Sequence, residues 1–306
     1  MAVSTKPVLI CVVGPTAIGK TQLAIALAQA FNTEIVSADS RQFFKEMNIG
    51  TAVPTKAELK QAPHHFIQNR SIFDPFTVGD FEKGALKVLH GIFKKATSAV
   101  LVGGSGLYVD AVVKGLDHFP KTGPGHRRDL NSIFEKKGML PLQNELEQTD
   151  PEYFAIVDAH NKQRVIRALE VIRETGRPFS SFLKKETHAR DFNTVFVGLQ
   201  APRQVVYQRI NQRVDVMMKR GLLDEARRLY PHKNLNALKT VGYKELFGYF
   251  EGKTNLGAAV AEIKKNTRRY AKRQHTWFKK NKGILWFDHK TDALTIVKEV
   301  KNQEVF

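Results

Sequence analysis

The feature that most constrains the fold is an apolar run that leads straight into a glycine loop. Residues 7–13, PVLICVV, are apolar and rich in β-branched side chains, which is typical of a short buried strand. The loop GPTAIGKT follows at residues 14–21, and the next residues, QLAIALAQAF, repeat apolar side chains at helical spacing. Strand, loop and helix form the context in which G-x-x-x-x-G-K-[ST] binds phosphate groups, with the lysine supplying charge and the Thr21 hydroxyl ligating Mg²⁺. The residues expected to surround the phosphates are Gly14, Pro15, Thr16, Ala17, Ile18, Gly19, Lys20 and Thr21.

Two further strand candidates end in residues suited to a ligand site. EIVSAD, residues 34–39, ends at Asp39, and SAVLVGG, residues 98–104, leads into Ser105. A segment with helical apolar spacing, residues 80–96, lies between them, and strands that alternate with helices predict a parallel sheet. Ligands of such sheets bind beyond the carboxyl ends of the strands. We therefore predict an α/β fold, a P-loop-type parallel sheet flanked by helices, with Asp39, Ser105 and the glycine loop at one crevice.

Asp39 distinguishes this chain from P-loop proteins that hydrolyse nucleotides. Those proteins hold Mg²⁺ with an aspartate that ends a later apolar strand, whereas the strand candidate at 98–102 is followed by two glycines. Asp39 comes early and precedes the polar residues Ser40, Arg41 and Gln42, which suits a general base directed at an acceptor substrate. The alternative interpretation is an aspartate that caps a turn or a helix.

The character of the sequence changes after residue 120. KTGPGHRRDL combines glycine, proline and basic residues, and stretches with helical spacing follow, the last of them NKQRVIRALEVIRETG. Asn161 is the expected N-cap of this last helix and Gly176 its expected stop. TVFVGL, residues 194–199, then predicts a strand that returns to the sheet. We therefore divide the chain into a catalytic core, residues 1–120 and 191–306, and a small all-helical insertion domain, residues 121–190.

The charge of the chain points to a polyanionic partner. Lys and Arg outnumber Asp and Glu by 48 to 30, a net charge of +18, and residues 264–283 hold nine of the basic residues and no acidic one. On a helix, basic side chains would fall on one side and aromatic ones on the other, Arg268, Lys272 and Lys279 against Tyr270, Trp277 and Phe278. A basic arc opposite an aromatic, core-facing side suits a helix that follows a phosphodiester backbone. The alternative is an ordinary solvated amphipathic helix.

Composition argues against several other classes of protein. No run of about 18 uncharged apolar residues occurs, so we expect no membrane span. The single cysteine, Cys11, lies in the first strand, which argues against disulfides and cysteine-based zinc sites and fits the reducing cytoplasm. The pair His64–His65 has no third ligand at a usual spacing, so we expect no metal there. The apolar N-terminal run continues into the glycine loop, which a cleaved leader would not do.

Taken together, these segments resemble the tRNA dimethylallyltransferases, also called tRNA isopentenyltransferases, in their bacterial form. The matching segments follow the same order along most of the chain: GPTAIGKT, SADSRQFFKEMNIGTAVPT, PHHFI, LVGGSGLYVDAVVKGL, QRVIRALEV, RVDVMMKRGLLDEA, TVGYKEL and KRQHTWFK. The resemblance implies that the loop holds dimethylallyl diphosphate and that ATP is not hydrolysed. It implies an acceptor adenosine 3′-adjacent to a tRNA anticodon, flipped out of its stack and converted to N6-isopentenyladenosine with release of diphosphate. It also implies a monomer whose insertion grips the anticodon stem-loop.

The resemblance also assigns roles to individual residues. Asp39 would be the general base, and Ser105, where the family usually has threonine, would bond the diphosphate or the base. Lys20, Thr21 through Mg²⁺, and Arg213 would stabilise the departing diphosphate. The implied tRNA contacts are Asp39, Ser40, Arg41, Gln42, Ser105, Arg127, Gln163, Arg164, Val165, Ile166, Arg167, Lys239, Thr240, Val241, Gly242, Tyr243, Lys244, Lys272, Arg273, Gln274, His275, Thr276, Trp277, Phe278 and Lys279.

Three rival functions stay open at the level of the sequence. A small-molecule or nucleoside kinase would share the P-loop core. An adenylate isopentenyltransferase would use a free nucleotide as acceptor, but the insertion and the basic helix exceed what so small an acceptor needs. An RNA-binding module with a vestigial loop would have no need for Lys20, Thr21 and Asp39.

Overall fold

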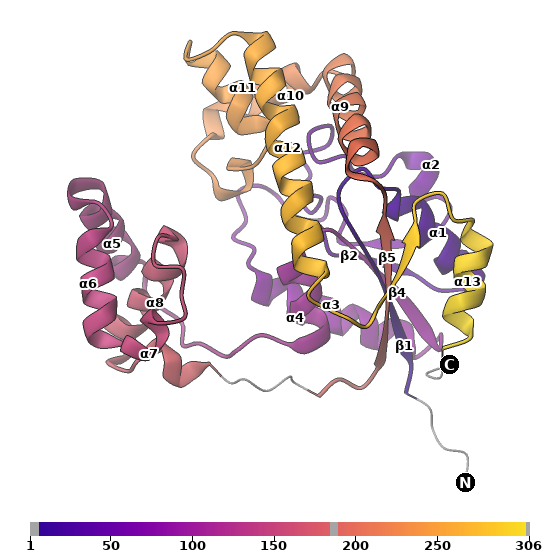
Figure 1. Cartoon of the computed structure of the whole chain (residues 1–306), viewed down its shortest axis with the longest axis horizontal. Helices are drawn as coiled ribbons and strands as arrows, with labels where there is room; N and C mark the ends of the chain where they lie inside the picture. Colours follow the sequence, from indigo (N-terminus) through magenta and orange to yellow (C-terminus); the bar gives the residue numbers. More distant parts are fainter. Residues whose placement is uncertain (1–5, 184–188, 304–306) are drawn as a thin grey trace. The chain divides into compact units, whose positions relative to one another are not determined.

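A computed structural model describes residues 6–183 and 189–303 (Figure 1). The chain forms two compact units, one made of Met1–Lys114 with Ala189–Phe306 and the other of Gly115–His188. These units correspond to the predicted core and insertion, but the second unit begins at Gly115 rather than at residue 121 and ends at His188 rather than at 190.

The first unit is built on a sheet of six parallel strands. Its order is β3-β2-β4-β1-β5-β6, so β1 lies between β4 and β5. The strands are β1 (Val8–Val13), β2 (Ile35–Ser37), β3 (His64–His65), β4 (Ser98–Val102), β5 (Asn193–Gln200) and β6 (Ile284–Asp288). The predicted α/β fold with a parallel sheet is confirmed. The strands β3 and β6, at the two edges of the sheet, were not predicted.

Helices cover both faces of this sheet, which explains why every residue of β1 is buried. Alternate residues of a strand point to opposite faces, and Val8, Ile10 and Val12 pack in one core cluster with residues of α1 (Lys20–Ala30) and α13 (Ala293–Lys301). Leu9, Cys11 and Val13 pack in a second cluster with residues of α3 (Val78–Phe93) and α4 (Gly106–Lys114). The strand that leads into the glycine loop is therefore packed against helices on both faces of the sheet.

A third apolar cluster joins the later helices of the first unit to the loop after β2. It brings together residues such as Phe44, Met47, Leu222, Tyr243 and Ile263. The helices concerned are α9 (Arg203–Lys219), α10 (Leu222–Leu229), α11 (Tyr243–Phe250) and α12 (Leu256–Phe278), with short 3-10 turns η2 (Tyr230–His232) and η3 (Asn236–Leu238) between them. The short helix α2 (Lys56–Leu59) precedes β3. Along α12, one row of side chains therefore belongs to the core.

The helix α12 differs from the predicted basic helix at both ends. It begins eight residues before the segment 264–283, because the Asn255 side chain accepts a hydrogen bond from the Ala258 amide and caps the helix there. It ends at Phe278, so Lys279 and Lys280 follow the helix instead of continuing its basic face. The strand β2 is likewise shorter than predicted, and Asp39 lies beyond its last residue, Ser37.

The second unit is helical, with its own apolar core. Its helices are α5 (Pro124–Lys137), α6 (Leu140–Thr149), α7 (Pro151–Phe154), α8 (Lys162–Thr175) and the 3-10 turn η1 (Phe179–Phe182). Asn161 caps α8 by accepting a hydrogen bond from the Arg164 amide, and Gly176 ends it in the left-handed conformation at φ 67°. Both predicted ends of this helix are confirmed. Among all described residues, no helix has the length and apolar character needed to cross a bilayer.

Candidate active site

The glycine loop between β1 and α1 forms a cradle of backbone amides. Gly14 and Gly19 adopt φ angles of 137° and 114°, and Ala17, although not a glycine, adopts φ 65°. Gly14 is also required for space, because a Cβ there would lie 2.6 Å from the Leu199 carbonyl oxygen. The first turn of α1 has no side-chain cap, so its amide groups lack acceptors within the helix. Such a helix start attracts an anion through its N–H groups and its dipole.

Lys20 lies at the start of α1 within this cradle. In this structure, its Nζ donates a hydrogen bond to the Pro15 carbonyl oxygen at 2.8 Å, so the ammonium group folds back over the loop. Burial, with the positive charge of Arg213 as a second cause, lowers the pKa of Lys20 to about 8. The charge of Asp39 acts in the opposite direction. A phosphate group next to Lys20 would stabilise the charged form, because it supplies the counter-charge that this cation lacks. Thr21, the next residue, is partly exposed.

Asp39 lies in the loop after β2 and shares the electrostatic environment of Lys20. Its Oδ1 accepts a hydrogen bond from the Arg41 amide at 3.0 Å, which orients the carboxyl group. Burial raises the pKa of Asp39 above the ordinary aspartate value, while the Arg41 amide and the charge of Lys20 act against this shift. A half-buried carboxylate with a raised pKa is a better proton acceptor than a solvated one.

Ser105 joins the loop after β4 to the loop after β2. Its Oγ accepts a hydrogen bond from the Ser40 amide at 3.2 Å and donates one to Ser40 Oγ at 3.2 Å. The two loops approach closely because Gly103 has no side chain: a Cβ there would lie 2.4 Å from the Ala38 carbonyl oxygen. Ser105 is therefore next to the residue that follows Asp39.

Two arginines of α9 contact residues of the glycine loop. Arg213 Nη1 donates to Thr16 Oγ1 at 3.4 Å, and Arg209 Nε donates to the Ala17 carbonyl oxygen at 2.8 Å. Burial and the charge of Arg209 lower the pKa of Arg213. Arg209 was not predicted, although its spacing of four residues from Arg213 places both on one helix face. The structure thus brings Lys20, Asp39 and Arg213 to one site.

The predicted contact residues Arg41 and Gln42 hold neighbouring loops. Arg41 Nη1 donates to the carbonyl oxygens of Asn236 and Ala237, each at 3.1 Å. Gln42 Nε2 donates to the carbonyl oxygens of Thr51 at 3.2 Å and Ala52 at 3.0 Å. Both side chains are only partly exposed, so their first function in the free protein is to shape this loop.

The predicted segment 239–244 contains both exposed and buried residues. Lys239 and Lys244 are exposed, and Thr240 and Val241 are partly exposed. Gly242 is buried, and its amide donates to Glu245 Oε2 at 2.8 Å. Tyr243 is fully buried and donates its hydroxyl hydrogen to Glu225 Oε1 at 2.8 Å. Its side chain belongs to the core in the free protein, and its contact with tRNA stays a prediction.

Glu225, which sequence reasoning missed, is the centre of that buried contact. It is 3% exposed and accepts hydrogen bonds from three consecutive amides, those of Asn48, Ile49 and Gly50. An acidic residue in the first turn of a helix looks like an ordinary helix-stabilising charge in a sequence, and no local signal marks its distant partners.

On α12, the exposed predicted residues are Lys272, Arg273 and Thr276, and Lys279 is exposed just past its end. Gln274 is 5% exposed and Phe278 4%, so in the free protein both side chains face the core, and their contact with tRNA stays a prediction. Trp277 is the reverse case. It was predicted both to pack on the core and to contact tRNA; it is 38% exposed, and its Nε1 donates to Asp110 Oδ2 at 2.9 Å.

His275 is half-buried, with its ring edge-on to the ring of Trp286 at a centroid distance of 5.8 Å. Burial, followed by the charge of Lys279, lowers the pKa of His275 and favours the neutral imidazole. Elsewhere, His65 Nε2 lies 2.6 Å from Glu34 Oε2, so this histidine is engaged in a pair with a carboxylate.

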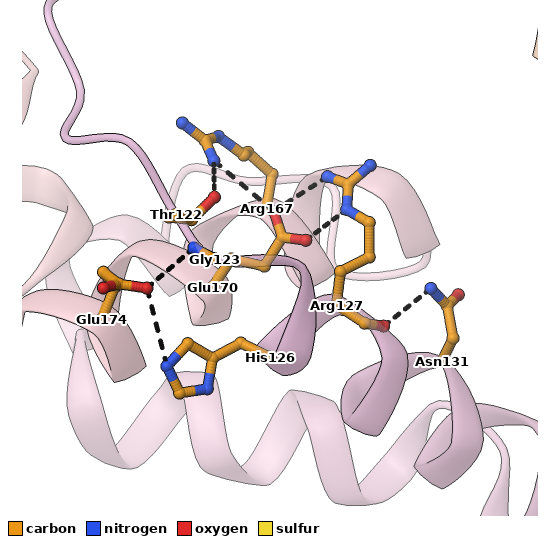
Figure 2. A network of polar contacts seen from close by, with 8 residues as sticks. All are labelled: Thr122, Gly123, His126, Arg127, Asn131, Arg167, Glu170 and Glu174. Carbon is orange, nitrogen blue, oxygen red and sulfur yellow. Dashed lines mark hydrogen bonds and ion pairs between the residues drawn. The ribbon is translucent and has the colours of Figure 1, made fainter.

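In the second unit, a buried carboxylate organises two predicted tRNA contacts (Figure 2). Glu170 is 2% exposed; Arg127 donates to both of its carboxylate oxygens, and Arg167 Nη1 lies 3.5 Å from Oε2. Arg167 Nη1 also donates to Thr122 Oγ1 at 3.0 Å. Two guanidinium groups against one carboxylate leave a net positive charge at the surface of this unit.

The remaining predicted residues of α8 divide by burial. Gln163 and Arg164 are exposed, as a contact with RNA requires. Val165 and Ile166 are buried at 0% and 2% exposure in the core of the unit. Their side chains pack the core of the second unit, and their contact with tRNA stays a prediction.

Comparisons with known proteins agree on one family. The family described as IPP transferase matches residues 42–281. The tRNA dimethylallyltransferase of Christiangramia forsetii is 56% identical over 96% of this chain and 98% of its own length. That of Flavobacterium psychrophilum is 52% identical over 96% of this chain and 98% of its own length.

Solved structures lead to the same group. The full-length tRNA isopentenylpyrophosphate transferase of Bacillus halodurans is 37% identical, with a TM-score of 0.72, 97% of this chain covered and 95% of that one. A eukaryotic dimethylallyltransferase, solved as crystallographic snapshots acting on tRNA, is 26% identical, with a TM-score of 0.78 over 92% of this chain and 74% of that one. Because the family model spans most of the chain, and relatives more than half identical cover nearly its whole length, the chain belongs to the IPP transferase family.

Proposed function

We propose that this protein transfers a dimethylallyl group from dimethylallyl diphosphate to the exocyclic amine of the adenosine 3′-adjacent to the anticodon of tRNA. The products are N6-isopentenyladenosine in tRNA and diphosphate. Relatives 52–56% identical over nearly the whole chain bear the name tRNA dimethylallyltransferase. The observation that carries the proposal is the meeting of Lys20, Arg213 and the uncapped start of α1 with the raised-pKa carboxyl group of Asp39.

The reaction follows from this arrangement. The adenosine amine attacks the first carbon of the dimethylallyl group, a C–N bond forms, and the bond from that carbon to the diphosphate oxygen breaks. Asp39 accepts the proton that the amine loses. Lys20, Arg213 and the amides of the cradle stabilise the charge that develops on the departing diphosphate. The Ser105 hydroxyl, held by Ser40, offers a hydrogen bond to the bridging oxygen or to the base.

The cofactor of this proposal is Mg²⁺, with Thr21 as its protein ligand. The site suits this ion because Mg²⁺ is commonly held by one or two protein oxygens together with substrate phosphates and water. Thr21 is partly exposed in the first turn of α1, next to Lys20. When bound, Mg²⁺ would neutralise part of the diphosphate charge.

The tRNA is proposed to contact basic surfaces on both units. On the first unit these are the exposed residues Lys272, Arg273 and Lys279. On the second unit the contacts are Arg127, Arg164 and Arg167, two of them organised by Glu170 (Figure 2). Each phosphate that such residues neutralise releases counterions, which makes binding salt-dependent. We further propose a monomer working in the cytoplasm.

The test compares Asp39→Asn with the unchanged protein on an anticodon stem-loop, with dimethylallyl diphosphate and Mg²⁺. Asparagine keeps the size of the side chain and an acceptor for the Arg41 amide, but it accepts no proton. Transfer should fall by roughly 10²–10⁴-fold, the usual contribution of a general base, while the affinity for diphosphate stays within a factor of about two. Mass spectrometry of the nucleosides identifies the product. Near-normal transfer by Asp39→Asn would refute the assigned role.

The same preparation separates the rival functions. RNA-independent release of ADP from ATP would identify a kinase, and equal transfer to AMP and to the stem-loop would identify an adenylate isopentenyltransferase. Stem-loop binding without transfer under any condition would leave an RNA-binding module.

A further inference from the structure

A buried glutamine on α12 joins the cradle to the loop after β4. Gln274 Oε1 accepts a hydrogen bond from the Thr16 amide at 2.8 Å, and its Nε2 donates to the Gly104 carbonyl oxygen at 2.9 Å. The side chain is 5% exposed, whereas its neighbours Lys272 and Arg273 are exposed. Both hydrogen-bonding ends of the carboxamide are therefore used inside the protein.

The loop after β4 is shaped to receive this side chain. A Cβ at Gly104 would lie 2.1 Å from Gln274 Nε2, so any larger residue would displace the carboxamide. Ser105, the next residue, hydrogen-bonds to Ser40. One carboxamide thus connects the cradle with the loop that carries Ser105.

The contact falls beside the strained part of the cradle. Ala17 adopts φ 65°, a left-handed conformation that costs a non-glycine residue about 1 kcal/mol or more. Three side chains from neighbouring helices contact this turn: Arg209 bonds to the Ala17 carbonyl oxygen, Arg213 to Thr16 Oγ1, and Gln274 to the Thr16 amide. Without Gln274, the Thr16 amide loses its acceptor, and only the two arginine contacts still hold the turn.

We propose that Gln274 is a positioning residue that holds the cradle in the shape that binds diphosphate, and that its side chain makes no contact with RNA. This inference rests on the proposed function, because it takes the ligand of the cradle to be a diphosphate. It separates two functions along a single helix: exposed basic residues of α12 face the polyanion, and one buried amide supports the donor site.

The test replaces Gln274 by methionine, which has nearly the same volume but no donor or acceptor of comparable strength. Inorganic diphosphate with Mg²⁺ is titrated by calorimetry, and binding of a labelled anticodon stem-loop is measured by fluorescence anisotropy. Gln274→Met should weaken diphosphate binding about 10-fold, as expected for one lost hydrogen bond, and should leave stem-loop affinity within about two-fold. The matched control is Gln204→Met at an exposed position of α9, which should change neither affinity.

A second variant reaches the same contact from the opposite side. Gly104→Ala should displace Gln274 and reproduce the loss of diphosphate affinity, and the double variant Gly104→Ala, Gln274→Met should be no weaker than the stronger single one, because both remove one interaction. Additive effects would overturn the proposal. So would a Gln274→Met protein that binds diphosphate normally, or one that loses stem-loop affinity alone. If the unchanged protein binds no diphosphate, the proposed function fails, and this outcome is distinct from failure of the role of Gln274.

Discussion

Replacing Glu225 by glutamine should lower the free energy of unfolding by about 2–4 kcal/mol, although the two side chains have nearly the same shape. In the structure, Oε2 of Glu225 accepts the amides of Asn48 at 3.1 Å and Ile49 at 2.8 Å. Oε1 accepts the amide of Gly50 at 2.9 Å and the hydroxyl of Tyr243 at 2.8 Å. Four donors therefore share one buried carboxylate.

The magnitude follows from counting acceptors. A glutamine side chain has one oxygen and one NH₂ group, so two of the four donors meet a donor. The Tyr243 hydroxyl can rotate and accept from the NH₂ group, but the Gly50 amide cannot, and at least one buried N–H loses its partner. A hydrogen bond to a charged group contributes roughly 1.5–3 kcal/mol, and the two bonds that survive lose the charge of their acceptor. The lost hydrogen bond and the weakening of the two surviving ones together give the expected loss of about 2–4 kcal/mol.

The assay is urea unfolding followed by fluorescence and circular dichroism, with the slope m compared between variants. Tyr243→Phe removes a single donor and should cost roughly 1.5–3 kcal/mol; the double variant should lose less than the sum, because both changes act on Oε1. Glu299→Gln, at an exposed position of α13, is the matched control and should stay within about 0.5 kcal/mol. A loss below about 0.5 kcal/mol for Glu225→Gln would refute the reasoning.

Three further predictions concern the proposed site. The pH profile of kcat/KM for the donor should fall on the acid side where Asp39 becomes protonated, above the ordinary aspartate pKa. It should also fall on the alkaline side near pH 8, where Lys20, with its pKa lowered to about 8, loses its charge. Lys20→Arg should shift only the alkaline limb upwards, and an alkaline limb that does not move would contradict this assignment. Arg213→Met should lower kcat about 10²–10³-fold in single-turnover transfer, because one cation of the leaving-group site is lost, and a change confined to stem-loop affinity would exclude that role. Arg164→Ala should reduce the salt dependence of stem-loop binding by about one unit of slope, measured by anisotropy at several salt concentrations, whereas an unchanged slope would mean that this exposed arginine meets no phosphate.

The parts of this protein that could be predicted from its sequence are those with local signals. The run before Gly14 is a strand because its apolar residues are contiguous and β-branched, and the strand-loop-helix order predicts a parallel sheet. Asn161 and Gly176 mark the ends of α8 because capping depends on residues close in the chain. Asp39 and Lys20 meet because strand ends of a parallel sheet share one edge.

The parts that escaped prediction depend on partners far away in the chain. A basic helix with aromatic residues implies one exposed and one buried side, but only the packed structure shows that Gln274 is buried and Trp277 exposed. Gln274 bonds to Thr16, 258 positions away, and Glu225 to Gly50, 175 positions away. A segment that matches a binding motif contains both contact residues and the residues that support them, and the motif alone does not separate the two.

The place of β1 in the sheet has a consequence for the synthesis of this protein. Its neighbour on one side, β5 (Asn193–Gln200), is translated only after the whole second unit. At typical translation rates, one edge of an entirely apolar strand waits roughly 10–40 s for its partner, and an unpaired strand edge is a template for aggregation. Each residue in the second unit lengthens this wait, so the insertion prolongs the time during which the nascent chain exposes an unpaired, aggregation-prone strand edge.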